Sequence, residues 1–224
     1  MTPLDKYLTA HSTPFPPSMD WVVKQTHIRT NYPQMLSGAV QGRLLTMLVQ
    51  LTGARRILEI GTFSGYSAAC MALGLPSGGH IDTLEINDEM EDIIREGWER
   101  AGVTDRITLH IGDARSTLES FAQSLSSAPV PPSYGTEGGT DFPACPHPEE
   151  RYYDMVFMDA NKREYCEYFN LVLPIVREGG LIVADDVLWD GKVFREEVPG
   201  DRQTSGIAAF NDMVAADPRV ETVM

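Results

Sequence analysis

The stretch Ile57–Ser67 reads Ile-Leu-Glu-Ile-Gly-Thr-Phe-Ser-Gly-Tyr-Ser, and it carries the clearest indication of the fold. Its apolar beginning predicts a buried strand, and Gly61 and Gly65 predict a sharp loop that leads into a helix. Such a loop lets the backbone approach a ligand, and the start of the helix offers unpaired N–H groups. The Gly-x-x-x-Gly spacing differs from the Gly-x-Gly-x-x-Gly of dinucleotide-binding folds, and no Lys-Ser/Thr pair follows as in a P-loop. An ordinary strand–helix turn is the alternative for this stretch alone.

The next predicted strand, His80–Glu85, supplies the second half of the pattern. It ends in an acidic residue, Glu85, about twenty positions after Gly65. Ligands of open α/β sheets bind beyond the carboxyl ends of the strands, where an acid can accept hydrogen bonds from both ribose hydroxyls. The two strand ends together therefore predict a nucleoside-binding site.

The composition is that of a globular protein, and it argues against several classes of partner. The 224 residues, of which 42% are hydrophobic and 22% charged, predict one domain, residues 1–224. A formal net charge of −14 argues against nucleic acid or an anionic membrane as the partner. No apolar run approaches the ~18 residues that a membrane-spanning helix needs. Three cysteines without metal-ligand spacing, and the lack of a signal-peptide pattern, predict a cytoplasmic protein.

Strand and helix patterns alternate along most of the chain. The predicted strands are Arg56–Ile60, His80–Glu85, Arg106–Ile111, Tyr153–Asp159, Leu181–Asp185 and Arg219–Met224. The predicted helices between them are Tyr66–Leu73, Asp88–Ala101, Arg115–Leu125, Glu164–Val176 and Thr204–Ala216. This alternation predicts an α/β fold with a doubly wound, mostly parallel Rossmann-like sheet, helices on both faces and all strand ends at one edge.

Two segments depart from this alternation. Residues 1–53 are predicted to be helical, with helices at Leu4–Ala10, Ser18–Thr30 and Arg43–Thr52. Residues 126–150 are rich in Pro, Gly and Ser and bury too little apolar surface to fold alone. A flexible insertion is therefore predicted there, and a lid or a partner-binding surface is the alternative.

Acidic side chains follow two of the later predicted strands. Asp159 ends the fourth strand, and Asp185 ends the fifth, with Asp186 directly after it. If these strands are neighbours, three carboxylates converge, and a hard divalent cation such as Mg²⁺ would relieve their repulsion. Lys162 lies in the loop after Asp159. The alternative is that these residues are solvated aspartates at strand ends and a surface lysine.

Residues 58–67, Leu-Glu-Ile-Gly-Thr-Phe-Ser-Gly-Tyr-Ser, and 84–87, Leu-Glu-Ile-Asn, resemble the class I S-adenosylmethionine-dependent methyltransferases. Within that class, the chain from Tyr32 onward is similar to the metal-dependent catechol and caffeoyl-CoA O-methyltransferases. The resemblance implies transfer of a methyl group from S-adenosylmethionine to a hydroxyl of a small catechol-like or caffeoyl-type acceptor. It also implies that residues 1–53 form a helical cover over the active site and that the protein is a homodimer.

The resemblance assigns cofactor contacts to the positions that match the family's motifs. Ser37 matches a contact to the methionine end, Ser67 a contact to the methionine carboxylate, and Glu85 the ribose-binding acid. The whole predicted cofactor set is Ser37, Glu59, Gly61, Thr62, Ser67, Glu85, Asp113, Ala114 and Asp159. Within it, Asp113 and Ala114 match the adenine-binding position, and a simple helix cap is the alternative for Asp113.

The resemblance also assigns the reaction chemistry. Asp159, Asp185 and Asp186 match the family's metal ligands, and Lys162 matches the base that deprotonates the acceptor hydroxyl. Lys162 and Asp159 are therefore the predicted catalytic residues. The family commonly has Asp-Asn where this chain has Asp185-Asp186, and the extra charge implies tighter metal binding or a choice of Mn²⁺ or Ca²⁺ over Mg²⁺.

The remaining expectations concern the substrate side, the end of the chain and the competing functions. Trp189 and Asp190 match the family's substrate-side loop and are the predicted acceptor contacts. Relatives continue beyond a strand at Arg219–Met224 into a final antiparallel strand that this sequence lacks, so we expect the strand to be poorly held. A nicotinamide-dependent oxidoreductase is one alternative function, because Glu85 suits any adenosine ribose. A cofactor-binding module without catalysis is the other.

Overall fold

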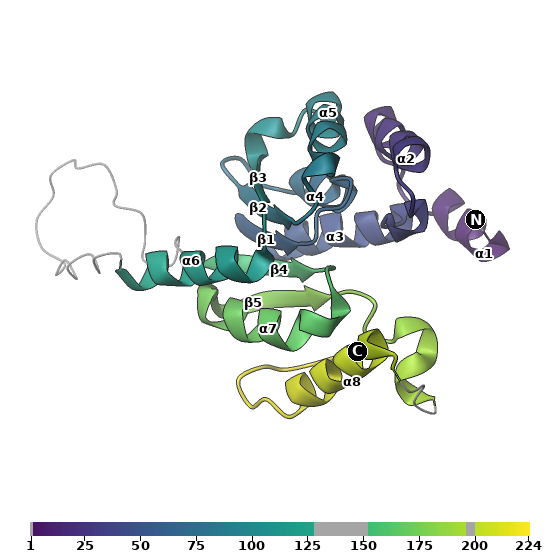
Figure 1. Cartoon of the computed structure of the whole chain (residues 1–224). Helices are drawn as coiled ribbons and strands as arrows, with labels where there is room; N and C mark the ends of the chain where they lie inside the picture. Colours follow the sequence, from purple (N-terminus) through teal and green to yellow (C-terminus); the bar gives the residue numbers. More distant parts are fainter. Residues whose placement is uncertain (1, 128–151, 196–199) are drawn as a thin grey trace, which may run out of the picture.

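The computed structural model of the chain describes residues 2–127, 152–195 and 200–224 (Figure 1). Its centre is a five-stranded sheet with the strand order β3-β2-β1-β4-β5, in which every neighbouring pair is parallel. The strands are β1 (Arg56–Ile60), β2 (His80–Glu85), β3 (Ile107–Ile111), β4 (Tyr153–Met158) and β5 (Val176–Ala184). The strand order reverses between β1 and β4, which is the place where open α/β sheets bind ligands. The predicted doubly wound parallel sheet is confirmed.

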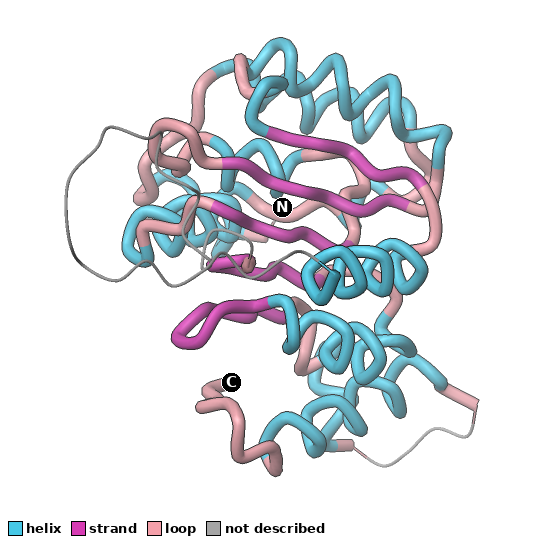
Figure 2. Tube along the Cα trace, turned by 90° about the vertical axis from the view of Figure 1, so that its left-hand side faces the viewer, coloured by secondary structure: helices cyan, strands magenta, loops and turns pink. Residues whose placement is uncertain are grey.

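Helices cover both faces of this sheet (Figures 1 and 2). One layer consists of α2 (Pro17–Arg29), α3 (Ala39–Thr52), α4 (Tyr66–Ala72) and α5 (Glu91–Ala101). The opposite layer consists of α6 (Ala114–Ser127), α7 (Tyr165–Val172) and α8 (Arg202–Ala215). Strand side chains alternate between the two cores, so Ile57 packs under the first layer and Leu58 under the second. A short helix, α1 (Pro3–Ala10), contacts α3.

A glycine fixes how closely the ends of β1 and β4 approach each other. Gly61 has φ 100°, and a Cβ atom there would collide with the carbonyl oxygen of Asp159. Any other residue would therefore be strained in its own backbone and would push the two loops apart. This contact brings Asp159 beside the loop that follows β1.

The predicted strand Arg219–Met224 is wrong, because these residues form no strand (Figure 2). Arg219 turns back on Asp217 instead: its backbone N–H donates to Asp217 Oδ1 at 2.9 Å, and its Nη2 donates to Oδ2 at 2.6 Å. A strand needs a neighbour for its backbone hydrogen bonds, and among the described residues no strand pairs with this segment.

Several predicted boundaries also shift. The helix expected over Glu164–Val176 ends at Val172, and a 3₁₀ turn, Leu173–Ile175, leads into β5. Pro174 explains this early end, because proline lacks the N–H that a helix interior requires. The predicted helix Arg43–Thr52 begins earlier, at Ala39. Of the predicted insertion 126–150, α6 takes the first two residues, and residues 128–150 lie outside the described part of the chain.

None of the described helices is both long and apolar enough to cross a bilayer.

Candidate active site

A cavity of about 800 Å³ lies at the carboxyl ends of the strands. Of the residues that the sequence assigns to the site, it is lined by Ser37, Gly61, Thr62, Ser67, Glu85, Asp113, Ala114, Asp159, Lys162, Asp185, Asp186 and Trp189. Glu59 and Asp190 are the two predicted residues that do not line it. We call residues 61–67 with Glu85 the glycine-loop half of the cavity, and Asp159, Lys162, Asp185 and Asp186 the carboxylate half.

In the glycine-loop half, Glu85 joins the loops after β1 and β2. Its Oε2 accepts the backbone N–H of Phe63 at 2.7 Å, and its Oε1 accepts that of Asn87 at 2.9 Å. Phe63 is held at φ 50°, a left-handed conformation that is unusual for an aromatic residue. Each carboxylate oxygen keeps a lone pair, so Glu85 can still accept hydrogen bonds from a ligand in the cavity.

Glu59 lies behind this half rather than in it. Its side chain is fully buried, and its carboxyl group is hydrogen-bonded to the hydroxyls of Ser67 and Thr83, both at 2.5 Å. Burial raises the pKa of Glu59 to about 8, and the two hydroxyl hydrogen bonds oppose that rise only in part. Glu59 therefore reaches the cavity through the Ser67 hydroxyl, which does line it.

Asp113 has two roles in the structure. Its Oδ2 accepts the backbone N–H of Ser116 at 3.1 Å, which is the geometry of a helix cap at the start of α6. Asp113 and Ala114 also line the cavity beside the end of β3. The cap that the sequence offered as an alternative is therefore present, together with access to the cavity.

In the carboxylate half, three acids converge. Asp159, Asp185 and Asp186 each place a carboxylate oxygen within 4.8 Å of the other two. Burial, above all, raises the pKa of Asp159 to about 6, with the Asp185 and Asp186 charges adding to the rise and Lys162 opposing it. Burial likewise raises the pKa of Asp186. Three hard oxygen donors at this spacing suit a divalent cation of the Mg²⁺ or Ca²⁺ kind.

Lys162 is buried within this acidic cluster. Only 5% of the residue is exposed, so it is not the surface lysine of the alternative interpretation. Its Nζ donates to Asp159 Oδ1 and to the Tyr165 hydroxyl, both at 2.7 Å, and lies 3.7 Å from Asp186 Oδ2. The chain reverses here through the 3₁₀ turn Lys162–Glu164, which directs the lysine back to the strand end.

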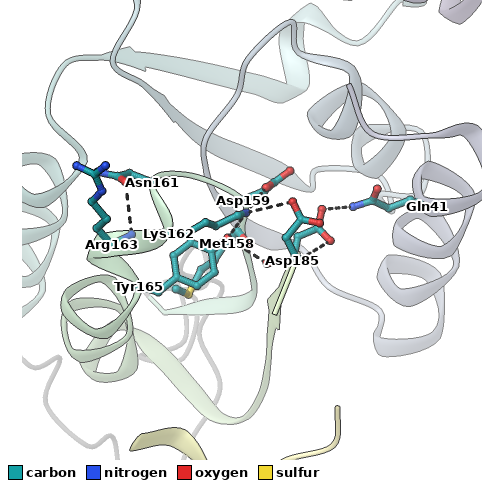
Figure 3. A network of polar contacts seen from close by, with 9 residues as sticks. Gln41, Met158, Asp159, Asn161, Lys162, Arg163, Tyr165 and Asp185 are labelled. Carbon is teal, nitrogen blue, oxygen red and sulfur yellow. Dashed lines mark hydrogen bonds and ion pairs between the residues drawn. The ribbon is translucent and has the colours of Figure 1, made fainter. Parts of the chain in front are cut away.

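Two contacts of the carboxylate half were not predicted (Figure 3). The Tyr165 hydroxyl donates to the Met158 carbonyl at 3.0 Å and lies 3.3 Å from the Asp185 carbonyl. Gln41, from α3, donates to Asp185 Oδ2 at 2.5 Å. The spacing of three residues between Lys162 and Tyr165 is a usable sequence signal, since such residues face each other on one helical turn. Gln41 offers none, because 144 residues separate it from Asp185.

The loop after β5 is strained where it meets the cavity. Asp186, Trp189 and Asp190 all have positive φ, at 57°, 45° and 54°. Such conformations cost ~1–3 kcal/mol each and cluster at functional sites. Trp189 lines the cavity, whereas Asp190 is exposed beside it.

Comparison with known proteins agrees with this geometry. A family model described as O-methyltransferase matches residues 9–129 and 145–224. A catechol O-methyltransferase from Niastella koreensis is 35% identical over 184 residues, which cover 82% of this chain and 72% of the relative. Caffeoyl-CoA O-methyltransferase 5 from Nicotiana tabacum is 31% identical over 195 residues, covering 85% and 72%.

A solved structure extends the likeness to the whole fold. The O-methyltransferase from Bacillus cereus in complex with SAH superimposes with a TM-score of 0.81 at 32% identity, covering 98% of this chain and 88% of that one. The glycine loop, the strand-end acids and these matches lead to one conclusion: the chain belongs to the O-methyltransferase family.

Proposed function

We propose that this enzyme transfers the methyl group of S-adenosylmethionine to a hydroxyl of a small catechol-like or caffeoyl-type acceptor, with a divalent cation held by three aspartates. The observation that carries the proposal is the carboxylate half of the cavity, where buried Lys162 lies among Asp159, Asp185 and Asp186. The names of the similar relatives and the SAH complex of the Bacillus cereus enzyme support the acceptor class and the cofactor. These findings disfavour the nicotinamide-dependent alternative.

The glycine-loop half suits the adenosyl and methionine parts of the cofactor. Glu85 accepts hydrogen bonds from the ribose hydroxyls, using the lone pairs that the backbone N–H groups of Phe63 and Asn87 leave free. Ser67, held by Glu59, presents its hydroxyl to the methionine carboxylate. The other assigned contacts are Ser37, Gly61, Thr62, Asp113, Ala114 and Asp159. Glu59 supports this surface from behind.

The three aspartates suit Mg²⁺, with Mn²⁺ or Ca²⁺ as alternatives. Their oxygens lie within 4.8 Å of one another, and Asp186 contributes a charge that an asparagine would not. Gln41 and the backbone N–H of Asp186 hold the two oxygens of Asp185, at 2.5 and 2.8 Å, and so fix its orientation. When bound, the cation supplies a Lewis acid that polarises the hydroxyls of the acceptor.

Lys162 handles the proton. Its Nζ is held between Asp159 and the Tyr165 hydroxyl, where it is placed to take the proton from the attacking hydroxyl. The acceptor oxygen then forms a bond to the methyl carbon while the carbon–sulfur bond breaks, and that electron pair neutralises the sulfonium. Holding both reactants in line in one cavity can supply ~7–11 kcal/mol of the barrier. Trp189 flanks the acceptor at the cavity wall, and Asp190 is exposed beside that wall.

The homodimer and the cytoplasmic location stay proposals. Helix α3 exposes an apolar stripe at helical spacing, with Val40 37%, Leu44 56%, Met47 49% and Leu51 78% exposed. Such a stripe on a surface helix suits burial against a second copy of the chain. Val40 and Gln41 are adjacent, so this dimer would lie beside the carboxylate half.

A transfer assay by mass spectrometry tests the proposal. The enzyme and S-adenosylmethionine are mixed with a panel of catechols and caffeoyl compounds, with Mg²⁺ or with EDTA. We expect a product heavier by one methyl group that is lost with EDTA and in Asp159→Asn, but kept in the exposed control Asp105→Asn. Equal transfer in EDTA would refute the metal assignment, and no transfer to any member of the panel would refute the acceptor class.

A further inference from the structure

Trp98 of α5 supports the glycine loop from outside the cavity. Its indole Nε1–H donates to the carbonyl oxygen of Gly65 at 2.9 Å, and the residue is 1% exposed. The same carbonyl accepts the backbone N–H of Ala69 at 3.1 Å. Trp98 does not line the cavity, so this hydrogen bond reaches the site from behind.

The peptide that Trp98 holds lies at the centre of the loop. Thr62 to Ser64 and Tyr66 to Ser67 line the cavity on either side of Gly65, which has φ 78°. The peptide plane is rigid, so fixing the Gly65 carbonyl also fixes the Tyr66 N–H in the opposite direction. A Cβ at position 65 would lie 2.6 Å from Trp98 Nε1, so the glycine and the tryptophan depend on each other.

We propose that Trp98 is a positioning residue that preorganises the glycine loop for the S-adenosyl ligand. The inference rests on the proposed function, which places that ligand in this cavity. Glycine has more backbone freedom than any other residue, and a loop that must be ordered on binding loses affinity. The indole N–H supplies that order before the ligand arrives.

The neighbouring contacts provide matched controls. Trp21 of α2 packs on the same helix α5, with its ring 4.6 Å from the Arg100 guanidinium, and does not line the cavity. Ile94 is fully buried on α5, and its Cγ2 would lie 3.2 Å from a Cβ at position 65. Trp21→Phe therefore repeats the substitution on α2, at a ring that packs on α5, and Ile94→Val loosens packing beside Gly65 without removing a hydrogen bond.

The test is the dissociation constant for S-adenosylhomocysteine, measured by calorimetry. Trp98→Phe keeps an aromatic ring but removes the N–H, and a net hydrogen bond of this kind corresponds to an increase of about fivefold in Kd. We expect the donor KM to rise with it while kcat at saturation stays unchanged. Trp21→Phe and Ile94→Val should remain within about twofold of wild type.

Each result decides a different question. An unchanged Kd in Trp98→Phe, or an equal rise in Ile94→Val, would overturn the positioning role while leaving the proposed function intact. A wild-type chain that does not bind S-adenosylhomocysteine would overturn the proposed function, and this inference with it.

A second measurement needs no folded variant at position 98. The chain has three tryptophans, so the wild type gives three indole N–H resonances, and those of Trp21 and Trp189 are assigned by their loss in Trp21→Phe and Trp189→Phe. The Trp98 proton should exchange with solvent far more slowly than that of Trp21 and should shift when S-adenosylhomocysteine is added. Exchange as fast as that of Trp21, or no shift, would overturn the proposal.

Discussion

The glycine-loop half and the carboxylate half of the cavity lie at the same edge of one sheet but are held together differently. In the first half, Glu85 accepts two backbone N–H groups, and Glu59 behind it is hydrogen-bonded to two hydroxyls, whereas the buried Ser64 hydroxyl has no hydrogen-bond partner among the described residues. In the second half, three carboxylates converge and Lys162 pairs with two of them, Asp159 and Asp186, and the loop after β5 contains strained residues. The carboxyl groups of the first half have their partners within the chain, whereas the second half gathers like charges that the proposed cation would neutralise.

The difference suggests that the two halves bind their ligands in different ways. A site whose groups are already satisfied can bind a ligand without rearrangement. A cluster of like charges instead stores unfavourable energy that the right ion releases. Substitutions at four positions test this difference.

Lys162→Met should have the largest effect, and only on the carboxylate half. Removal of a general base typically costs ~10²–10⁴-fold in rate. Lys162 pairs with two of the three aspartates, Asp159 and Asp186. We expect kcat to fall by that range while the Kd for S-adenosylhomocysteine stays unchanged, as measured by the transfer assay and calorimetry. The exposed Lys24→Met serves as the control. Wild-type turnover in Lys162→Met would remove the base assignment.

Gly61→Ala should affect both halves, because Gly61 is where they touch. The new Cβ would collide with the Asp159 carbonyl in a backbone of φ 100°. Strain and overpacking together should lower the free energy of unfolding by about 3 kcal/mol and weaken cofactor binding.

The control for this substitution is Gly102→Ala, which has φ 69° but open space around the position. It isolates the backbone cost of about 1 kcal/mol. The free energies of unfolding are measured in urea. Equal losses in the two variants would show that the close approach of β1 and β4 adds nothing to the destabilisation.

Glu59 makes the glycine-loop half sensitive to pH. Its pKa is raised from 4.5 to about 8, mainly by burial, so the folded chain keeps a proton that the unfolded chain has lost. Between those pH values, stability should therefore fall as pH rises, by up to about 1.4 kcal/mol per pH unit. This contribution is fully present below pH 4.5 and is lost by about pH 8.

Glu59→Gln isolates this contribution, because glutamine resembles the neutral acid and does not titrate. The free energies of unfolding of wild type and variant should be compared in urea at several pH values with EDTA. We expect the wild type to lose free energy of unfolding relative to Glu59→Gln as the pH rises. A difference that is constant with pH would mean that buried Glu59 is already ionised.

The sequence predicted the parts of the site that are local in the chain. The glycine loop, Glu85 and the pair Asp159 and Lys162 each lie within a few residues of a strand end, and all of them line the cavity. The parallel direction of the strands was predicted from the alternation of helix and strand patterns. Parallel strands place Asp185 at the same edge of the sheet.

The contacts that escaped prediction depend on packing between distant segments. Gln41 reaches Asp185 across 144 residues, and Trp98 reaches Gly65 from another helix. The full burial of Glu59 depends on Thr83 in the neighbouring strand, so matching its position to a motif could not reveal that it lies behind the cavity. The wrong strand at Arg219–Met224 has the same origin, since a strand exists only where a neighbour takes its hydrogen bonds.

Asp186→Asn should have the smallest effect, and it tests whether the three acids repel one another when no cation is present. Asparagine tolerates the positive φ of position 186 and removes one of three converging charges, although it also weakens the ion pair with Lys162. The Asp186 side chain is 58% exposed, so solvent screening limits the expected gain in EDTA to about 0.5–1 kcal/mol of unfolding free energy.

Asp190→Asn is the matched control for that gain, because Asp190 has a similar φ of 54° but lies outside the acidic cluster. Relief of backbone strain alone would stabilise both variants equally, whereas relief of repulsion would favour Asp186→Asn. Added Mn²⁺ should erase the excess if the proposed metal site is right, because the third carboxylate would let the wild type bind the ion more tightly. A stability of Asp186→Asn below that of Asp190→Asn in EDTA would mean that Lys162 already balances the three acids. The two halves of the cavity would then be held in the same way.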